Sequence, residues 1–410
     1  MVLEKSVKAN STANFYIIVA DELDEANKPN YNLNTNVLFA KDILNYTTDV
    51  WNDLSFKYSL VEFCTAIKPS CFQYFFDEKK YDKVVYLDPD VFVFNPLASI
   101  FDALETTSIL LTPHIVTMQT PFKGDYPDHL FLLNGTFNLG FIGLKKSETT
   151  NSLLVWWQNR LLNDCFADND KGTLTDQKWM NLLPAFFEPN ELTISKNIGL
   201  NLAPWNYFER EIVEANNCFY VSNRVTKIIK NRSPLIFVHF SGYNYKSFSN
   251  NTIEHTNQNF TSYPDLQPIF NCYANALKEG NIEQYIQEKY TYNYFENGVN
   301  IIGLHRRIYR SLINDGIALS NPFLTNENSF FNTLKAKKLI DYAKTSADNV
   351  SNKNLPAFDN KLKLVYTLFR LLKFIIGVRK YSMFIRFLKR FAKEENQTFL
   401  IDKSFGKKLK

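Results

Sequence analysis

The sequence has few cysteines, no secretion signal and no long uncharged hydrophobic segment. Its five cysteines are widely spaced and form no Cys-x-x-Cys pair, which argues against a disulfide framework or a zinc site and fits a reducing cytosol. The N-terminal residues lack the apolar core and cleavage site of a signal peptide. No apolar stretch approaches the roughly 20 residues of a membrane span. We therefore expect a cytoplasmic protein, soluble or attached peripherally to the inner face of the membrane.

Composition and charge separate the C-terminal residues from the rest of the chain. Hydrophobic residues make up 45% of the 410 positions and aromatic residues 15%, enough for one large core or two smaller ones. A disordered or collagen-like chain is thereby excluded. The formal net charge is +4, but residues 361–410 contain fourteen Lys or Arg and three acidic residues. Those fifty residues therefore carry +11, and the remainder of the chain carries −7.

The segment Tyr81–Pro96 holds the most informative pattern. Residues 83–87 (KVVYL) predict a strand that is buried on both faces, and the strand is followed by the carboxylates Asp88 and Asp90 around a proline. Ligands of open α/β sheets bind at the carboxyl ends of the strands. Two carboxylates two residues apart can share a divalent cation there. An acidic turn that merely ends the strand is the alternative interpretation of this pattern alone.

Strands alternate with helical stretches along the first 250 residues, which predicts a mostly parallel sheet with helices on both faces. The expected strands are 15–20, 83–87, 108–112, 138–144 and 234–240, and the expected helices are 3–10, 37–44, 60–76, 101–104, 152–162 and 173–183. We expect residues 1–250 to form the α/β domain, 251–350 a helical extension, and 351–410 a basic amphipathic helical tail.

Five short motifs follow one another in the α/β region. They are YLDPD at 86–90, FNLGFIGL at 137–144, TDQKWMNLL at 175–183, WN at 205–206 and VHFSG at 238–242. Together they resemble motifs of the retaining glycosyltransferases of family 8, which have the GT-A fold and use metal-bound nucleotide-diphosphate sugars. The resemblance covers roughly residues 15–246. The residues from 256 onward resemble uncharacterised bacterial glycosyltransferases of polysaccharide clusters.

The resemblance implies a metal site at the ends of two strands. Asp88 and Asp90 would bind Mn²⁺ or Mg²⁺, with Asp88 also close to the donor, and His239 would supply a nitrogen ligand. An imidazole beside two carboxylates favours Mn²⁺. Without the resemblance, His239 is equally read as a hydrogen-bonded histidine at the end of a buried strand.

The same resemblance assigns residues to the donor sugar. Asn138 and Gly140 would line the floor beneath it, with the glycine allowing a close backbone approach. Asp176 and Gln177 would bind the sugar hydroxyls and face the anomeric carbon, as the catalytic residues. The alternative for this pair is a helix-start cap next to an exposed amide.

The diphosphate side shows a departure from the family pattern. Gly242 completes the His-x-x-Gly motif, but Tyr245 stands where the family usually has a diphosphate-binding lysine. Lys246 would serve after a shift of one residue. Lys68, upstream of the central strand, occupies the place of a basic donor-binding residue, and a solvated surface lysine is the competing interpretation.

Three further residues are expected on the acceptor side: His114, Asn206 and Glu209. The start of the chain departs from the family too, because residues 3–10 already predict the helix that follows the first strand of this fold. That first strand, which normally holds the nucleotide base with its loop, is expected to be missing.

The resulting functional expectation is the transfer of a hexose from a nucleotide diphosphate, with UDP expected, to a glycan or lipid-linked acceptor in cell-surface polysaccharide synthesis. The reaction would retain the anomeric configuration of the sugar and give an α-linkage. A haloacid-dehalogenase-type phosphatase also has Asp-x-Asp after a strand, but it expects a small hydroxyl residue where this chain has Phe92. A non-catalytic sugar-binding or scaffold protein is a second competing interpretation, and an inverting transferase with Glu209 as its base is a third.

The basic tail predicts a second property. Residues 361–393 place a cation every few positions in an apolar, aromatic-rich run, as interfacial membrane helices do. We expect it to contact an anionic membrane surface. A helix pair that packs on the catalytic domain with a solvated basic face is the alternative, and no nucleic-acid motif supports RNA binding.

Overall fold

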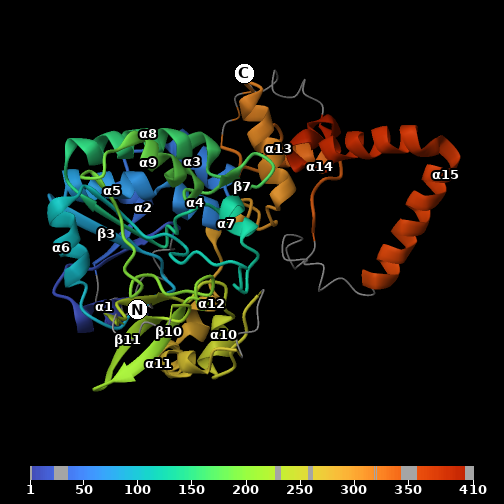
Figure 1. The fold of residues 1–410 in the computed structure, drawn as a ribbon. Helices are drawn as coiled ribbons and strands as arrows, with labels where there is room; N and C mark the ends of the chain where they lie inside the picture. Colours follow the sequence, from blue (N-terminus) through green and yellow to red (C-terminus); the bar gives the residue numbers. More distant parts are fainter. Residues whose placement is uncertain are drawn as a thin grey trace. The chain divides into compact units, whose positions relative to one another are not determined.

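The computed structural model describes residues 2–22, 36–226, 232–256, 262–317, 319, 321–342 and 358–401. They belong to two compact units, shown in Figure 1. The first consists of residues 1–44 and 64–288, and the second of residues 45–63 and 289–410. The boundary expected near residue 250 thus lies within the first unit, because helices after it pack into that unit's core.

A four-stranded sheet forms the centre of the first unit, in the order β3-β6-β5-β9. These strands are β3 (Lys83–Leu87), β5 (Ile109–Leu111), β6 (Phe141–Lys145) and β9 (Leu192–Ile194). The α/β class and the helical C-terminal region are confirmed. The pairing is mixed rather than mostly parallel, because β6 runs antiparallel to both β3 and β5. The connection from β5 to β6 returns to the same end of the sheet instead of crossing it.

A second pairing brings distant segments together. Strand β4 (Val91–Val93) directly follows the Asp-Pro-Asp turn and pairs antiparallel with β13 (Phe237–His239). In this register His239 lies opposite Val91, and the Phe240 amide donates to the Asp90 carbonyl at 2.9 Å. Both strands are buried, apolar and rich in β-branched or aromatic residues. Their pairing therefore places His239 beside the two carboxylates.

Helices and small sheets complete the first unit. Its remaining helices are α1 (Val2–Asn10), α2 (Ala40–Ile43), α5 (Lys68–Asp77), α6 (Ala98–Thr106), α7 (His129–Asn134), α8 (Glu148–Asp164), α9 (Leu183–Phe186), α10 (Tyr245–Ser249), α11 (Gln267–Glu279) and α12 (Ile282–Ile286). Its remaining strands are β1 (Tyr16–Val19), β2 (Asn36–Phe39), β7 (Ala167–Asp168), β8 (Thr173–Leu174), β10 (Arg210–Ala215), β11 (Cys218–Asn223) and β12 (Ser233–Pro234). Phe240 stacks on Tyr273 of α11 with ring centroids 3.9 Å apart, which ties α11 to the end of β13.

Several sequence-based elements differ in detail from the structure. The helix expected at 60–76 is two helices, α4 (Leu60–Ala66) and α5, because Pro69 lacks an N–H and fits only the first turn of a helix. The helix expected at 173–183 was wrong. Residues there form β8, a turn with Thr175 at φ +44° and a 3₁₀ helix at Lys178–Leu182. Residues 37–44 divide between β2 and α2. The early helix is confirmed as α1.

The second unit is built around α13 (Gly303–Asn314). Its other helices are α3 (Thr48–Lys57), α14 (Phe330–Ala336) and α15 (Phe358–Phe391), with 3₁₀ turns at Thr291–Asn293 and Glu394–Leu400. An aromatic core joins Phe56, Tyr309 and Phe330. Within this unit, the buried Arg306 guanidinium donates to the carbonyls of Phe56 at 2.6 Å and Tyr58 at 2.8 Å. One cation thus satisfies carbonyls where the chain leaves α3.

Replacement of this arginine tests how the second unit is held together. We expect Arg306→Ala to lower the free energy of unfolding by about 3–5 kcal/mol, because several buried carbonyls lose their donor. Chemical denaturation would measure the change. Arg379→Ala removes an exposed arginine of α15 and should stay within about 0.5 kcal/mol of the parent protein. A loss below about 1 kcal/mol for Arg306→Ala would contradict this account.

Candidate metal centre

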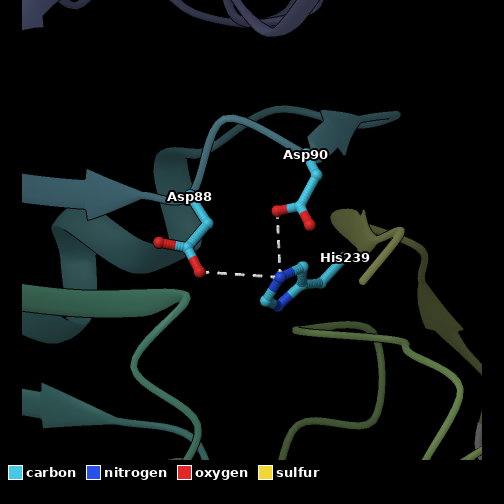
Figure 2. A group of neighbouring side chains, drawn as sticks. All are labelled: Asp88, Asp90 and His239. Carbon is cyan, nitrogen blue, oxygen red and sulfur yellow. Dashed lines mark ion pairs between the residues drawn. The ribbon is translucent and has the colours of Figure 1, made fainter. Parts of the chain in front are cut away.

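Asp88, Asp90 and His239 converge at the end of β3, as Figure 2 shows. His239 Nε2 lies 3.0 Å from Asp90 Oδ1 and 3.6 Å from Asp88 Oδ2. One ligand atom from each residue lies within 4.8 Å of the others. Two carboxylates and one imidazole in such a cluster are a donor set that suits Mn²⁺. The structure thus brings together the three residues that the motifs implied, and their binding of a metal remains a prediction.

Two tyrosines fix the carboxylates. The Tyr86 hydroxyl donates to Asp88 Oδ1 at 2.6 Å, and the Tyr245 hydroxyl donates to Asp90 Oδ2 at 2.8 Å. Each carboxylate therefore has one oxygen engaged and its other oxygen turned towards His239. Apart from His239, the buried Asp90 Oδ1 has no hydrogen-bond donor among the described residues. An oxygen of this kind is ready to bind a cation.

Asn138 orients the imidazole. Its Oδ1 lies 3.1 Å from His239 Nδ1 and also accepts hydrogen bonds from the Gly140 amide and from Asn201 Nδ2, at 3.1 Å each. Since the same oxygen accepts two other protons, His239 Nδ1 is assigned as the donor, which leaves Nε2 to face the carboxylates. Metal-binding histidines commonly hold their second nitrogen in this way.

Gly140 makes room for this histidine. A Cβ atom at this position would lie 2.2 Å from His239 Cε1 and 2.5 Å from Nδ1, closer than atoms can approach. The group that lies close to this glycine is the imidazole of His239. The glycine's predicted place beneath a donor sugar is not tested by this contact.

Charge balance in the cluster also suits a divalent cation. Burial alone would lower the pKa of His239, but Asp90 and Asp88 raise it above its usual value. Burial acts to raise the pKa of Asp90, and His239 brings it below its ordinary value. The two carboxylates thus favour the protonated form of His239, whereas a divalent cation at the same place would favour its neutral form.

A buried ion pair adjoins Asp88. Lys68, the first residue of α5, places Nζ 2.8 Å from Asp176 Oδ2 and 3.8 Å from Asp88 Oδ1. Burial acts to lower the pKa of Lys68, yet Asp176 and Asp88 raise it overall, so the lysine is charged. Burial raises the pKa of Asp176 despite Lys68. Lys68 is thus no solvated surface residue, and its ammonium group lies between two carboxylates.

Gln177 belongs to the same site but is engaged within the protein. Its Oε1 accepts from Asn138 Nδ2 at 3.2 Å and from the Leu139 amide at 3.1 Å, while its Nε2 donates to the Asn134 carbonyl at 2.9 Å. The side chain joins the segment before β6 to the turn that holds Asp176. Any contact of Gln177 with a sugar remains a prediction.

His114, Asn206 and Glu209 lie together in the first unit. Asn206 Nδ2 donates to the His114 carbonyl at 3.1 Å, and Glu209 accepts from the amides of Val116 and Thr117, the latter at 2.7 Å. Both side chains are buried and fix the turn that carries His114. They shape this side of the site through the turn.

His114 approaches the cluster through Trp205, which the sequence analysis placed in a motif but not among the site residues. The Trp205 ring centroid lies 5.3 Å from that of His114 and 5.3 Å from that of His239. Burial lowers the pKa of His114 to about 4, so the imidazole is neutral. His114 Nδ1 and Trp205 Nε1 are both buried without a hydrogen-bond partner in the described part of the chain. Such groups beside the Asp88, Asp90 and His239 cluster are suited to a polar ligand.

The expected diphosphate residues have different surroundings. Lys246 is exposed on α10, while Tyr245, at the position of the family's lysine, contacts Asp90. Gly242 has φ +79°, which favours glycine, and a Cβ there would lie 2.8 Å from His255 Nε2. The sequence shows that residue 245 departs from the family pattern, but it does not show that Tyr245 contacts Asp90.

Comparisons with known proteins give partial similarities. No protein-family model matches the chain. It is 29% identical over 217 residues to "Uncharacterized protein YfnF" of Bacillus subtilis (strain 168), which covers 53% of this chain and 67% of that protein. It is 28% identical over 187 residues to "Uncharacterized protein YfnD" of the same strain, which covers 44% and 54%. The chain thus spans about two thirds and about half of these curated relatives.

Two solved structures that resemble the chain in part are glycosyltransferases. One is a glycosyltransferase involved in the glycosylation of the major capsid of PBCV-1, with 10% identity, a TM-score of 0.30, and coverage of 55% of this chain and 92% of that chain. The other is mouse xyloside xylosyltransferase 1 in its apo form, with 13% identity, a TM-score of 0.33, and coverage of 58% and 90%.

The Tyr245 hydroxyl offers a direct test of the site. We expect Tyr245→Phe to weaken Mn²⁺ binding by about 10-fold, because Asp90 loses the donor that fixes its orientation. Electron paramagnetic resonance of free Mn²⁺ during a titration would measure the affinity. Tyr81→Phe, which removes a hydroxyl bonded to Tyr16, is the matched control and should bind as the parent protein does. Unchanged affinity in Tyr245→Phe would show that the tyrosine has no such role.

Proposed function

We propose that this chain is a metal-dependent glycosyltransferase. It transfers a hexose from a nucleotide-diphosphate sugar, with UDP as the expected nucleotide, to a glycan or lipid-linked acceptor of cell-surface polysaccharide synthesis. The observation that carries the proposal is the convergence of Asp88, Asp90 and His239 at the end of a sheet strand, each with its orientation fixed by a neighbouring side chain.

These three residues would hold Mn²⁺ or Mg²⁺ against the diphosphate of the donor. The cation's chemistry is to neutralise the charge that develops on the diphosphate as the glycosidic bond breaks. Lys68 adds a buried positive charge 3.8 Å from Asp88. The ion pair with Asp176 keeps the Lys68 ammonium group in place. Lys68 would therefore contribute to donor binding through the positive electrostatic potential that it adds at the site.

The sugar would lie beside the turn that holds Asp176 and Gln177. Gln177 and Asn138 are joined by a hydrogen bond, and within the proposal His114 Nδ1 and Trp205 Nε1, which lack partners in the described part of the chain, bind sugar hydroxyls of donor or acceptor. A hydroxyl that satisfies a buried, unpartnered nitrogen contributes to specificity as well as affinity.

Retention is favoured over inversion by the state of Glu209. An inverting transferase needs a carboxylate base beside the acceptor. The Glu209 carboxylate is buried, accepts from two backbone amides and lies 3.4 Å from the Arg210 guanidinium, so it is not available as that base. We therefore propose that the transferred sugar retains the α-configuration that it has in the donor.

The phosphatase alternative lacks a supporting contact. Such an enzyme would need a small hydroxyl side chain two residues after Asp90. The residue there is Phe92, whose ring packs against Phe94 and Tyr273 at centroid distances of 5.0 and 5.9 Å. A non-catalytic sugar-binding protein remains the second candidate, and it differs from the transferase by the outcome of a turnover assay.

A panel of nucleotide sugars tests the proposed function. With Mn²⁺ present, we expect slow hydrolysis or transfer of one donor, and a loss of roughly 100-fold or more in Asp90→Ala because a metal ligand is gone. Release of the nucleoside diphosphate would be measured. Asp102→Ala removes an exposed carboxylate of α6 and should retain full activity. Folded wild-type protein that binds no donor at any metal concentration would refute the proposal, and binding without turnover would favour the sugar-binding protein.

A further inference from the structure

Helix α15 (Phe358–Phe391) is bent into two segments at Gly377, as Figure 1 shows. This glycine has φ +76°, a conformation that other residues rarely adopt, and a Cβ atom there would meet nothing within 4 Å. Phe369 and Tyr381 contact each other across the bend, with ring centroids 6.3 Å apart. The bend is therefore encoded by the sequence and supported by a contact.

The segment before the bend exposes a continuous apolar stripe. Leu364, Leu368, Leu371 and Ile375 follow one another at helical spacing, so they lie on one face. Their exposed fractions are 61%, 56%, 54% and 69%. Single exposed leucines are ordinary on protein surfaces, but a row of four is not. Such a stripe is expected to be covered in the functioning protein.

Cations border this stripe. Lys361 lies next to the face that holds the four apolar residues, Lys363 and Arg370 lie further round on its other flank, and Lys373 lies on the opposite side of the helix, as their spacing shows. The segment after the bend also holds exposed apolar residues among cations: Ile385 is exposed by 38% and Phe387 by 59%, on different faces of the helix, in a run with five further cations. Over its whole length α15 contains nine Lys or Arg and one acidic residue.

The charge decides which partner fits. Two copies of α15 that faced each other through this stripe would bring like charges together without acidic residues to offset them. A single-stranded RNA would engage the cations but leave the aliphatic stripe exposed to water. An anionic lipid surface satisfies both, since its headgroups pair with the cations and its acyl region takes the apolar stripe.

We propose that α15 lies in the plane of an anionic membrane surface, with both of its segments in contact with lipid. None of the described helices is long and apolar enough to cross a membrane. The lysine and arginine stems extend along the helix, so their charged ends reach the headgroups while the stripe enters the acyl region. The bend at Gly377 lets two short segments, rather than one rigid rod, follow the surface.

Vesicle binding by the full chain tests this proposal. Sedimentation should show binding to phosphatidylglycerol-containing vesicles, weakened by salt, and roughly 10-fold or more weaker binding to phosphatidylcholine vesicles. The double variant Leu368→Ser, Leu371→Ser should lose about 10-fold or more in affinity, because the stripe can no longer enter the acyl region. Leu132→Ser removes a leucine that is 81% exposed in α7 and serves as the matched control. The assay involves neither nucleotide sugar nor metal, so its outcome is independent of the proposed transferase activity.

Three results would overturn the proposal. The first is wild-type protein that stays in solution with both kinds of vesicle, including when it binds RNA instead. The second is a serine double variant that binds anionic vesicles as well as the wild type does, because the stripe would then be irrelevant. The third is a wild-type dimer, detected by light scattering, that becomes a monomer in the double variant while vesicle binding stays absent.

Discussion

Two tyrosine hydroxyls govern the geometry of this protein's candidate site. Tyr86 and Tyr245 each engage one oxygen of a carboxylate, so the free oxygens of Asp88 and Asp90 meet at His239 Nε2. Without these bonds the orientation of each carboxylate would be less restricted. The arrangement also depends on the pairing of β4 with β13, since that register alone brings His239 to the end of β3.

The surroundings of this cluster are built to keep it in place. Asn138 fixes the imidazole, and Gly140 leaves the space that its ring fills. The buried pair of Lys68 with Asp176 supplies charge next to Asp88. Breaking one partner of a buried pair is costly, so these residues favour a single arrangement of the loops around the cluster. An excess of carboxylates suits a divalent cation, and a cation bound there would in turn attract a diphosphate.

Sequence analysis predicted the three residues of the cluster but not the residues that hold them in place. Asp88 and Asp90 follow an apolar strand and His239 is the last residue of another, and the ends of such strands can be predicted from the local sequence pattern. The antiparallel direction of β6 and the turn before Lys178–Leu182 could not be predicted, because both depend on contacts between segments that are distant in the sequence. The same holds for the hydrogen bond from Tyr245 to Asp90, because the two residues are 155 positions apart in the sequence. The positive charge of the tail can be counted in the sequence, whereas the exposure of its apolar stripe is known only from the structure of α15.

A crystal soaked in Mn²⁺ tests the central claim most directly, by anomalous diffraction at the manganese absorption edge. The account predicts one strong anomalous peak among Asp88 Oδ2, Asp90 Oδ1 and His239 Nε2, at roughly 2.0–2.3 Å from each of these atoms. Saturating Mn²⁺ without a peak at this position, or with a peak only at other residues, would contradict it.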